Sequence, residues 1–209
     1  MILKPDLYSS LRQSLAGALP GQAAHMRMAS ENRQLRLQHR KAPEDARRAG
    51  VLILLFEREQ ELAIPLIRRT EDGSVHSGQV ALPGGTFEPA DEDIVQTALR
   101  ETAEEIGVKA ATVEVLGRLS DLYIPPSNFL VSPVVGRIAD PPDFEPDPHE
   151  VAHIIEASVS ELLDEKRIKI TERFGFTVPY FDIQDEVIWG ATAMILSELC
   201  AILEPIAKG

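Results

Sequence analysis

The feature that most constrains this chain is a glycine pair followed by a helix-like segment with three clustered carboxylates. The glycines are Gly84 and Gly85, and the carboxylates belong to Glu101, Glu104 and Glu105. Because a helix turns by about 100° per residue, steps of three and four place these glutamates within one arc of roughly 100°. The neighbouring arc is apolar and contains Ile94, Val95, Ala98, Leu99 and Ile106. The pattern predicts a helix over about residues 92 to 106, with one face in a core and the carboxylates at its edge.

The three carboxylates need positive charge nearby, because like charges three or four residues apart destabilise a helix. Arg100 lies four residues before Glu104 and can pair with it, but one cation leaves surplus negative charge. A bound divalent cation compensates such a cluster, and ligands that are all oxygen favour Mg²⁺ or Mn²⁺ over zinc. The alternative is a solvated acidic helix face, which most Glu runs form. The preceding glycine turn and the fixed spacing favour the metal site.

Length and composition are those of one globular unit. The chain has 209 residues, 44% of them hydrophobic, which suffices for one substantial core. Its single cysteine, Cys200, lies in an apolar run and is expected to be a small core residue rather than a nucleophile. The longest uncharged stretch near the C-terminus, 187–197, is shorter than the roughly 20 residues of a membrane span. We therefore expect a cytoplasmic protein that does not contact a membrane.

The charge is acidic overall but unevenly distributed. A net charge of -12 argues against nucleic acid as a partner, because little cationic surface remains to displace phosphate counterions. Residues 1–50 nevertheless contain nine Lys and Arg against four Asp and Glu. The basic residues of this segment form a candidate phosphate-binding patch, and pairing with the acidic body of the domain is the alternative: Arg27, Arg33, Arg36, Arg40, Lys41, Arg47 and Arg48.

The N-terminal segment is expected to be an extension of the main domain. Leu7, Leu11, Leu15 and Leu19 recur every four residues and predict a short amphipathic helix that ends at Pro20 and Gly21. This helix must pack on its own domain or on a second subunit, which leaves a homodimer open. Residues 22–48 read as polar and irregular. We therefore divide the chain into residues 1–48, a helix with a basic extension packed on the domain, and residues 49–209, the main domain.

Strand and helix patterns alternate through the main domain. The runs at 51–56 and 61–69 predict a hairpin around the charged turn 57–60. Further strands are expected at 79–82, 112–119, 130–138, 151–155 and near 168 and 178, with helices at 159–166 and 188–203. Two proline-containing loops, 123–128 and 140–149, lie between them, and the first is a candidate substrate wall. This order predicts an α/β fold with a mixed β-sheet between helices.

The segment from Gly85 to Val108 resembles the Nudix box, in which Gly and Glu are separated by five residues and Arg-Glu follows seven residues later. Here six residues separate Gly85 from Glu92, and Thr102 replaces an aliphatic residue, while Arg100-Glu101 and Glu104-Glu105 keep the spacing of the box helix. The extra residue leaves the register of the helix intact. The resemblance implies an α/β/α sandwich whose loop-helix-loop carries catalysis.

The resemblance also implies roles for individual residues. Nudix proteins generally hydrolyse a nucleoside diphosphate linked to another moiety, with a metal-activated water. Glu101 and Glu105 are the implied metal ligands, and Glu104 is implied as a further ligand or as a helper in activating water. Arg100 would orient the carboxylates, and Glu92 would anchor the loop. Outside the box, Glu150 is the candidate general base, with a solvated loop charge as the alternative.

The residues before the box resemble those of coenzyme A pyrophosphatases. That subfamily has Arg-Ser, His-x-Gly-Gln and Phe-Pro-Gly-Gly in order, and this chain has Arg69-Thr70, then 76–79 reading HSGQ, then 82–85 reading LPGG. Ser74 replaces an arginine of the pattern, and the run 188–193, reading IWGATA, also resembles the subfamily. The implied substrate-binding residues are Arg69, His76, Gln79, Gly84 and Gly85.

The expected reaction is therefore cleavage of coenzyme A, and of acyl derivatives, to 3',5'-ADP and 4'-phosphopantetheine with Mg²⁺ or Mn²⁺. An ADP-ribose or NADH pyrophosphatase is the alternative within the family. A Nudix module that binds a nucleotide without cleaving it is the alternative of another class, and the retention of all three box glutamates disfavours it. His76 is expected either to donate a hydrogen bond to a phosphate of the substrate or to be a loop histidine bound to backbone. Trp189 is expected to be a core residue rather than a platform on which a base stacks.

Overall fold

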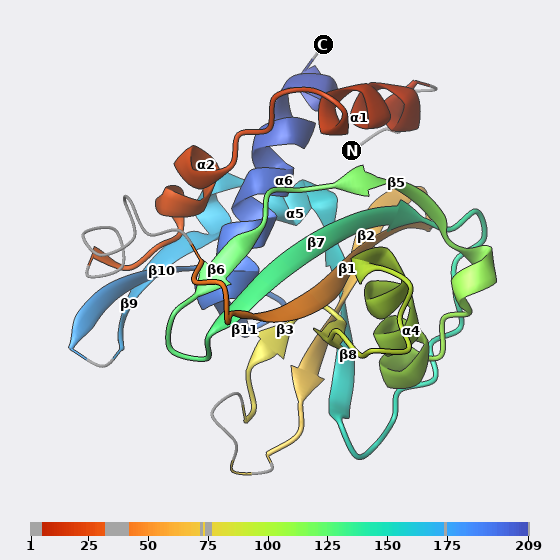
Figure 1. The fold of residues 1–209 in the computed structure, drawn as a ribbon. Helices are drawn as coiled ribbons and strands as arrows, with labels where there is room; N and C mark the ends of the chain where they lie inside the picture. Colours follow the sequence, from red (N-terminus) through yellow and green to blue (C-terminus); the bar gives the residue numbers. More distant parts are fainter. Residues whose placement is uncertain (1–5, 32–41, 72, 74–76, 174, 209) are drawn as a thin grey trace.

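The computed structural model describes residues 6–31, 42–71, 73, 77–173 and 175–208, and its centre is an eight-stranded mixed sheet (Figure 1). The order is β3-β2-β1-β7-β5, with β4 paired to β1, β6 to β7 and β8 to β2. Strands β1 and β7 are parallel, and the other pairs are antiparallel. The bounds are β1 Arg47–Arg58, β2 Glu61–Arg69, β3 Val80–Ala81, β4 Gly84–Thr86, β5 Glu114–Arg118, β6 Leu122–Ile124, β7 Phe129–Arg137 and β8 Val151–Ser158.

A second, antiparallel sheet has the order β11-β10-β9 and projects beside the main one (Figure 1). Its strands are β9 Ile168–Arg173, β10 Phe176–Ile183 and β11 Glu186–Trp189. The helices are α1 Leu7–Leu15, α2 Gln22–Arg27, α4 Ile94–Ile106, α5 Val159–Leu162 and α6 Gly190–Lys208, with short 3-10 turns η1 Ala110–Thr112 and η2 Glu165–Arg167.

Strand β1 is buried on both faces, which confirms the predicted sandwich. Leu52 and Leu54 lie in the apolar cluster that also contains Ala98 and Ile106 of α4. The alternate residues of β1, such as Ile53, belong to a second cluster with side chains of α1 and α6. Because successive strand residues point to opposite faces, one continuous apolar run serves both cores. Helix α4 therefore covers one face, and α6 with α1 covers the other (Figure 1).

The predicted hairpin of β1 and β2 is confirmed, and only two residues, Glu59 and Gln60, form its turn. Glu59 and Gln60 both have positive φ, 53° and 66°, as a two-residue turn of type I' requires. Strand β1 is longer than the run 51–56 and extends from Arg47 to Arg58. The parallel pairing with β7 begins at Arg47 opposite Phe129 and accounts for the added residues at the N-terminal end.

The N-terminal segment differs from the expectation in two places. Helix α1 ends at Leu15, one turn before the predicted stop at Pro20. Residues 22–27, read as irregular, form α2, which packs on α6. The buried side chains of α1, Leu7, Leu11 and Leu15, lie in the core cluster of the same chain, so this helix packs on its own domain.

The C-terminal helix also begins later than predicted. Residues 186–189, including Ile188 and Trp189, form β11 because they pair with β10, and α6 starts at Gly190, whose φ is 68°. By length and composition, α6 is apolar enough to cross a membrane. Most of its residues from Ala193 to Leu203 are buried, as expected of a core helix. Cys200 lies in this core, where burial raises the pKa of its thiol to about 12.

Candidate active site

Helix α4 is bounded by two capping residues, Asp93 at its N-terminus and Gly107 at its C-terminus. The side chain of Asp93 accepts a hydrogen bond from the Gln96 amide at 2.8 Å, and Gly107 ends the helix with a φ of 75°. The helix thus begins two residues after the predicted start. The helix packs closely on β1 at Gly50, where any side chain would come within 2.6 Å of the Ile94 carbonyl oxygen. The absence of a side chain at Gly50 therefore lets α4, with its glutamates, lie directly against the sheet.

The three box glutamates occupy graded environments on α4. Glu105 is buried, with 2% of its side chain exposed, Glu101 has 16% exposed, and Glu104 has 59% exposed. Glu101 and Glu104 thus lie at the edge of the buried face, as predicted, whereas Glu105 lies inside it. Thr102, which replaces the family's aliphatic residue, is fully buried and donates its hydroxyl to the Ala98 carbonyl at 2.6 Å. The hydroxyl is satisfied inside the helix, so this departure leaves the register of the glutamates unchanged.

Arg100 connects two of these glutamates to the preceding loop. Its guanidinium lies 3.0 Å from Glu101 Oε1 and 3.0 Å from Glu104 Oε2, and it donates to the Thr86 carbonyl at 3.1 Å. The same group binds Asp91 in a fork, with Nε 2.9 Å from Oδ1 and Nη2 3.1 Å from Oδ2. Arg100 therefore contacts Glu101 and Glu104, and its principal partner is Asp91, while its role in orienting the carboxylates stays a prediction.

Asp91 takes the anchoring role that the sequence assigned to Glu92. Its side chain is buried and also accepts hydrogen bonds from the Glu88 amide and the Thr97 hydroxyl. These hydrogen bonds, that of Arg100 foremost, hold the pKa of Asp91 far below its usual range. The side chain of Glu92 makes none of these contacts; its backbone amide donates to Gln96. Five residues separate Gly85 from Asp91, the family spacing, so the additional residue lies after the acidic anchor.

The glycine turn lies directly against the glutamates. Gly84 has a φ of 147°, and a side chain there would overlap the Gly50 carbonyl at 2.3 Å. Its amide donates to Glu105 Oε2 at 2.8 Å. At Gly85, a side chain would come within 2.4 Å of the Glu101 carboxylate. Both glycines are therefore required for the backbone to approach these two carboxylates.

Arg69 and Glu150 join the box glutamates from outside. Arg69 Nη1 lies 3.4 Å from Glu105 Oε1, and Nη2 lies 3.8 Å from Glu150 Oε2. The loop before β8 is tied to the end of α4, because the amides of Glu145 and Asp147 donate to the last helical carbonyls. Thr70 in turn donates its amide to the Glu150 carbonyl at 3.1 Å. The structure thus brings the distant candidate Glu150 to the box.

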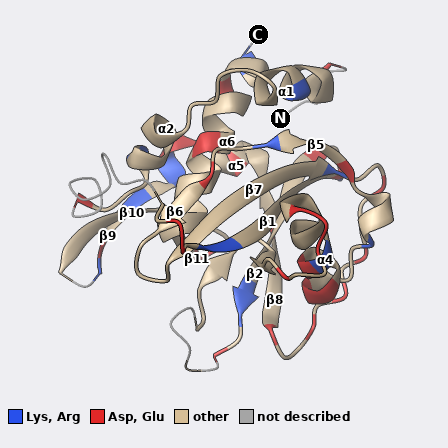
Figure 2. Cartoon of the chain, viewed as in Figure 1, with Lys and Arg blue, Asp and Glu red and all other residues tan. Residues whose placement is uncertain are grey.

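The electrostatics of Glu105 distinguish it from an ordinary surface carboxylate. Burial raises its pKa to about 8, although hydrogen bonding by Gly84 and the charge of Arg69 oppose the shift. The negative charges of Glu150 and Glu101 add to the rise. Burial also raises the pKa of Glu101. Figure 2 shows acidic colour along α4 and basic colour at the C-terminal end of β2, where Arg68 and Arg69 lie. Negative charge at this site exceeds the positive charge that the neighbouring residues supply.

The residues fit a hard divalent cation in chemistry, although they are not arranged as a closed metal cage. Within the described residues, no three His, Cys, Asp or Glu side chains converge closely enough to hold an ion as they stand. Arg100 holds Glu101 and Glu104, while Arg69 and Gly84 hold Glu105. The donors are all oxygen, and a buried carboxylate with a raised pKa gains from a cation. Assignment of Glu101, Glu104 and Glu105 as ligands stays a prediction.

Some of the predicted binding residues lie elsewhere or outside the described part. His76 and Ser74 lie outside the described residues, as do Arg33, Arg36, Arg40 and Lys41. Gln79 lies next to β3, and its carbonyl accepts the Arg69 amide at 3.0 Å. The described basic residues have their own partners: Arg27 pairs with Glu165 at 3.8 Å, while Arg47 and Arg48 lie over the rings of Phe129 and Phe87.

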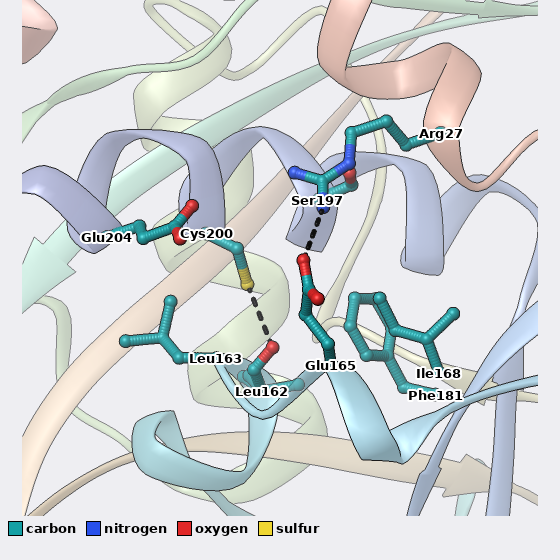
Figure 3. A pocket seen from close by; sticks show the side chains of 9 residues that line it. All are labelled: Arg27, Leu162, Leu163, Glu165, Ile168, Phe181, Ser197, Cys200 and Glu204. Carbon is teal, nitrogen blue, oxygen red and sulfur yellow. Dashed lines mark hydrogen bonds and ion pairs between the residues drawn. The ribbon is translucent and has the colours of Figure 1, made fainter.

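A small pocket lies away from α4, between α2, α5, α6 and β10 (Figure 3). Among its lining residues, Arg27 pairs with Glu165, and the Cys200 thiol donates to the Leu162 carbonyl (Figure 3). Its cavity volume of about 30 Å³ has room for water but not for a nucleotide. We therefore place the candidate active site at the glycine turn and α4.

A mixed sheet between helices, with a glycine turn facing a helix of clustered glutamates, defines the Nudix class of fold and site. The NUDIX domain family model matches residues 46–174, and the chain belongs to this family. It is 36% identical over 157 residues to an uncharacterised Nudix hydrolase, NudL, of Photorhabdus laumondii, covering 73% of this chain and 83% of the relative. It is also 36% identical over 167 residues to the mitochondrial Nudix hydrolase 15 of Arabidopsis thaliana. That match covers 75% of this chain but only 58% of the Arabidopsis protein.

Solved structures share the fold. A C. elegans Ap4A hydrolase in a binary complex aligns with a TM-score of 0.54 at 16% identity, covering 76% of this chain and 98% of the other. A Nudix hydrolase from M. smegmatis, RenU, aligns with a TM-score of 0.53 at 17% identity, covering 78% and 87%. At these identities the likeness concerns the fold alone. Nudix hydrolases generally need divalent metal ions, in keeping with the acidic site on α4.

Proposed function

We propose that the protein is a coenzyme A pyrophosphatase that hydrolyses coenzyme A, and acyl derivatives, to 3',5'-ADP and 4'-phosphopantetheine. The carrying observation is that Arg69, in the segment resembling coenzyme A pyrophosphatases, lies 3.4 Å from Glu105 of the Nudix box. The amide of Gly84, from the same segment, binds the other oxygen of Glu105. These contacts bring the segment that resembles coenzyme A pyrophosphatases against the box helix, which supports one shared site.

The residues divide the work by position. Glu101 and Glu105 would hold Mg²⁺ or Mn²⁺, with Glu104 at the exposed rim. When bound, such an ion neutralises charge on the diphosphate and lowers the pKa of an attacking water. Arg100, fixed by Asp91, holds Glu101 and Glu104 in place.

The remaining groups act on water and on substrate. Glu150 has 52% of its side chain exposed and is coupled by charge to both Glu101 and Glu105, which suits a base that takes the proton of water. Arg69, His76 and Gln79 would contact the substrate, Arg69 through phosphate oxygens. The glycines at 84 and 85 allow the diphosphate to approach the backbone without a steric barrier.

The test compares substrates under Mg²⁺ with a chelator control. The proposal expects coenzyme A to be hydrolysed with a higher kcat/KM than dephospho-coenzyme A, because the 3'-phosphate contributes to recognition. Equal turnover of dephospho-coenzyme A and ADP-ribose would favour the alternative of an ADP-ribose or NADH pyrophosphatase. Tight nucleotide binding with no turnover would favour a binding module instead.

The setting of the activity is also a proposal. The acidic net charge of -12 and the buried α6 support a cytoplasmic protein acting on a small molecule, without nucleic acid or membrane as a partner. A homodimer remains a prediction, and the packing of α1 on its own domain means that this helix does not require one. Sedimentation of the purified protein at several concentrations would decide the oligomeric state.

A further inference from the structure

Arg69 contacts two carboxylates from different elements, and neither contact is tight. Its distances of 3.4 Å to Glu105 and 3.8 Å to Glu150 exceed the roughly 2.7–2.9 Å of a charge-assisted hydrogen bond. The other oxygen of Glu105 is bound at 2.8 Å by the Gly84 amide. Arg69 therefore supplies positive charge to the free oxygen of Glu105 without closing a strong ion pair.

The backbone of Arg69 is fixed while its guanidinium is partly exposed. Its amide donates to the Gln79 carbonyl, and the next residue, Thr70, is hydrogen-bonded to the backbone of His149 and Glu150. The register between β2 and β8 shifts between Arg68 and Arg69, where β8 contains one additional residue, Ala152, so β2 itself keeps its normal alternation. The side chain of Arg69 is 29% exposed, which leaves its guanidinium free to turn about a fixed stem.

The neighbouring Arg68 provides an internal contrast. It has a similar exposure, 33%, and also pairs with a glutamate. Its contact with Glu186 is short, 2.7 Å, and the same glutamate lies 2.9 Å from His153 Nε2. Successive strand residues point to opposite faces, so Arg68 belongs to a separate ion-pair cluster. Of these two adjacent arginines, Arg68 therefore forms a short ion pair and Arg69 forms only long ones.

We propose that Arg69 is an exchangeable counter-ion, a role that rests on the proposed function of this site. It pairs with Glu105 and Glu150 in the absence of a divalent cation, and a cation bound at Glu105 would free its guanidinium for the diphosphate of the substrate.

Charge makes the exchange directional. A divalent cation carries twice the charge of a guanidinium and is smaller, so it binds carboxylate oxygens more strongly and repels the arginine from them. The displaced guanidinium would stay at the edge of the same site, because its backbone is fixed there, and would be available to pair with a diphosphate. Cation and substrate would then assist each other's binding. The cation would remove the carboxylate that competes for Arg69, and the substrate would supply Arg69 with a new anionic partner.

Arginine labelling tests the exchange directly. The intact protein is treated with p-hydroxyphenylglyoxal, with and without Mg²⁺, and the labelling rates of Arg68 and Arg69 are read by peptide mass spectrometry. Mg²⁺ should speed the labelling of Arg69 several-fold and leave that of Arg68 unchanged. Inorganic phosphate should then slow the labelling of Arg69 only when Mg²⁺ is present.

The variant Glu105→Gln supplies the matched control, with its fold verified by thermal denaturation. Since its principal carboxylate partner is gone, Arg69 should label quickly without Mg²⁺ and should not respond to the ion. An unchanged rate at Arg69 in the unsubstituted protein, or an equal change at Arg68, overturns the exchange.

Calorimetry with Mg²⁺ distinguishes a failure of the Arg69 exchange from a failure of the metal-dependent function. If Mg²⁺ binds and Arg69 does not respond, the exchange is wrong while the metal-dependent function stands. If Mg²⁺ does not bind, both are wrong. If Arg69 responds and coenzyme A is not hydrolysed, the exchange stands and the substrate assignment fails.

Discussion

Two buried glutamates on opposite faces of the main sheet, Glu105 on α4 and Glu198 on α6, show how differently a fold can treat the same charge (Figure 1). Glu198 is fully buried and accepts hydrogen bonds from the Gly21 amide at 2.8 Å and the Ser120 hydroxyl at 2.7 Å. Its carboxylate also lies 2.9 Å from Nε2 of the buried His25. Although burial alone would raise its pKa, these hydrogen bonds lower it. For Glu105, burial prevails and the pKa rises to about 8.

The difference separates a structural carboxylate, Glu198, from a candidate functional one, Glu105. Hydrogen bonds to Glu198 come from α2, the segment before it and the loop before β6, so this glutamate ties the N-terminal extension to the core. Glu105 receives one strong hydrogen bond and one loose ion pair, which leaves it able to gain from a cation. A buried acid whose hydrogen bonds are complete stabilises the fold, whereas one that is under-compensated stores affinity for a ligand.

The largest effect is expected from Glu105→Gln. The amide keeps the shape and the hydrogen bond from Gly84 but removes the charge, so kcat for coenzyme A should fall roughly a thousandfold, since a hard-cation site contributes several kcal/mol to the transition state. The fold should be retained, as judged by circular dichroism and thermal denaturation. Unchanged activity would mean that Glu105 has no role in catalysis and does not differ from Glu198 in this respect.

The opposite outcome is expected from Glu198→Ala. Removing this carboxylate leaves buried donors of Ser120 and Gly21 without an acceptor, so the free energy of unfolding should fall by about 3 kcal/mol. Turnover per folded molecule should stay close to that of the unsubstituted protein. Urea denaturation and steady-state kinetics on the same preparation measure both quantities, and a loss of kcat without a loss of stability would contradict the structural role.

Only part of this contrast is visible in the sequence. Glu105 is recognisable because the glycine turn and the helical spacing are local patterns that its neighbours carry. Glu198 gives no such signal, since His25 and Ser120 lie 173 and 78 residues from it along the chain. Short elements such as α2 and β11 were missed or misread for a related reason, because tertiary packing and strand pairing define them rather than their own few residues.

A third buried carboxylate, Asp91, is paired like Glu198 but lies in the candidate active site. Asp91→Asn should weaken the fork with Arg100, lowering the free energy of unfolding by about 2 kcal/mol and kcat by roughly tenfold to a hundredfold. Glu92→Gln is the matched control and should change neither by a measurable amount. Urea denaturation and kinetics on both variants measure these effects, and a larger effect at Glu92 would return to it the anchoring role predicted from the sequence.

The smallest effect concerns pH in the presence of a chelator. Because the folded pKa of Glu105 is about 8 and its ordinary value is 4.5, the fold binds this proton more tightly than the unfolded chain does. The resulting stability is fully present below about pH 4.5 and is lost as the pH rises toward 8. Relative to Glu105→Gln, which cannot titrate, the unsubstituted protein should lose unfolding free energy between pH 5 and 8.5.

Mg²⁺ should oppose this loss, since the ion takes the place of the proton on Glu105. Its stabilising effect should therefore be greater at pH 8.5 than at pH 6 in the unsubstituted protein and should be weak at both values in Glu105→Gln. Urea denaturation at each pH, with Mg²⁺ or chelator, measures the four differences. Parallel pH profiles for the two proteins in chelator would mean that Glu105 is as well compensated as Glu198, and the distinction between the two faces of the sheet would then disappear.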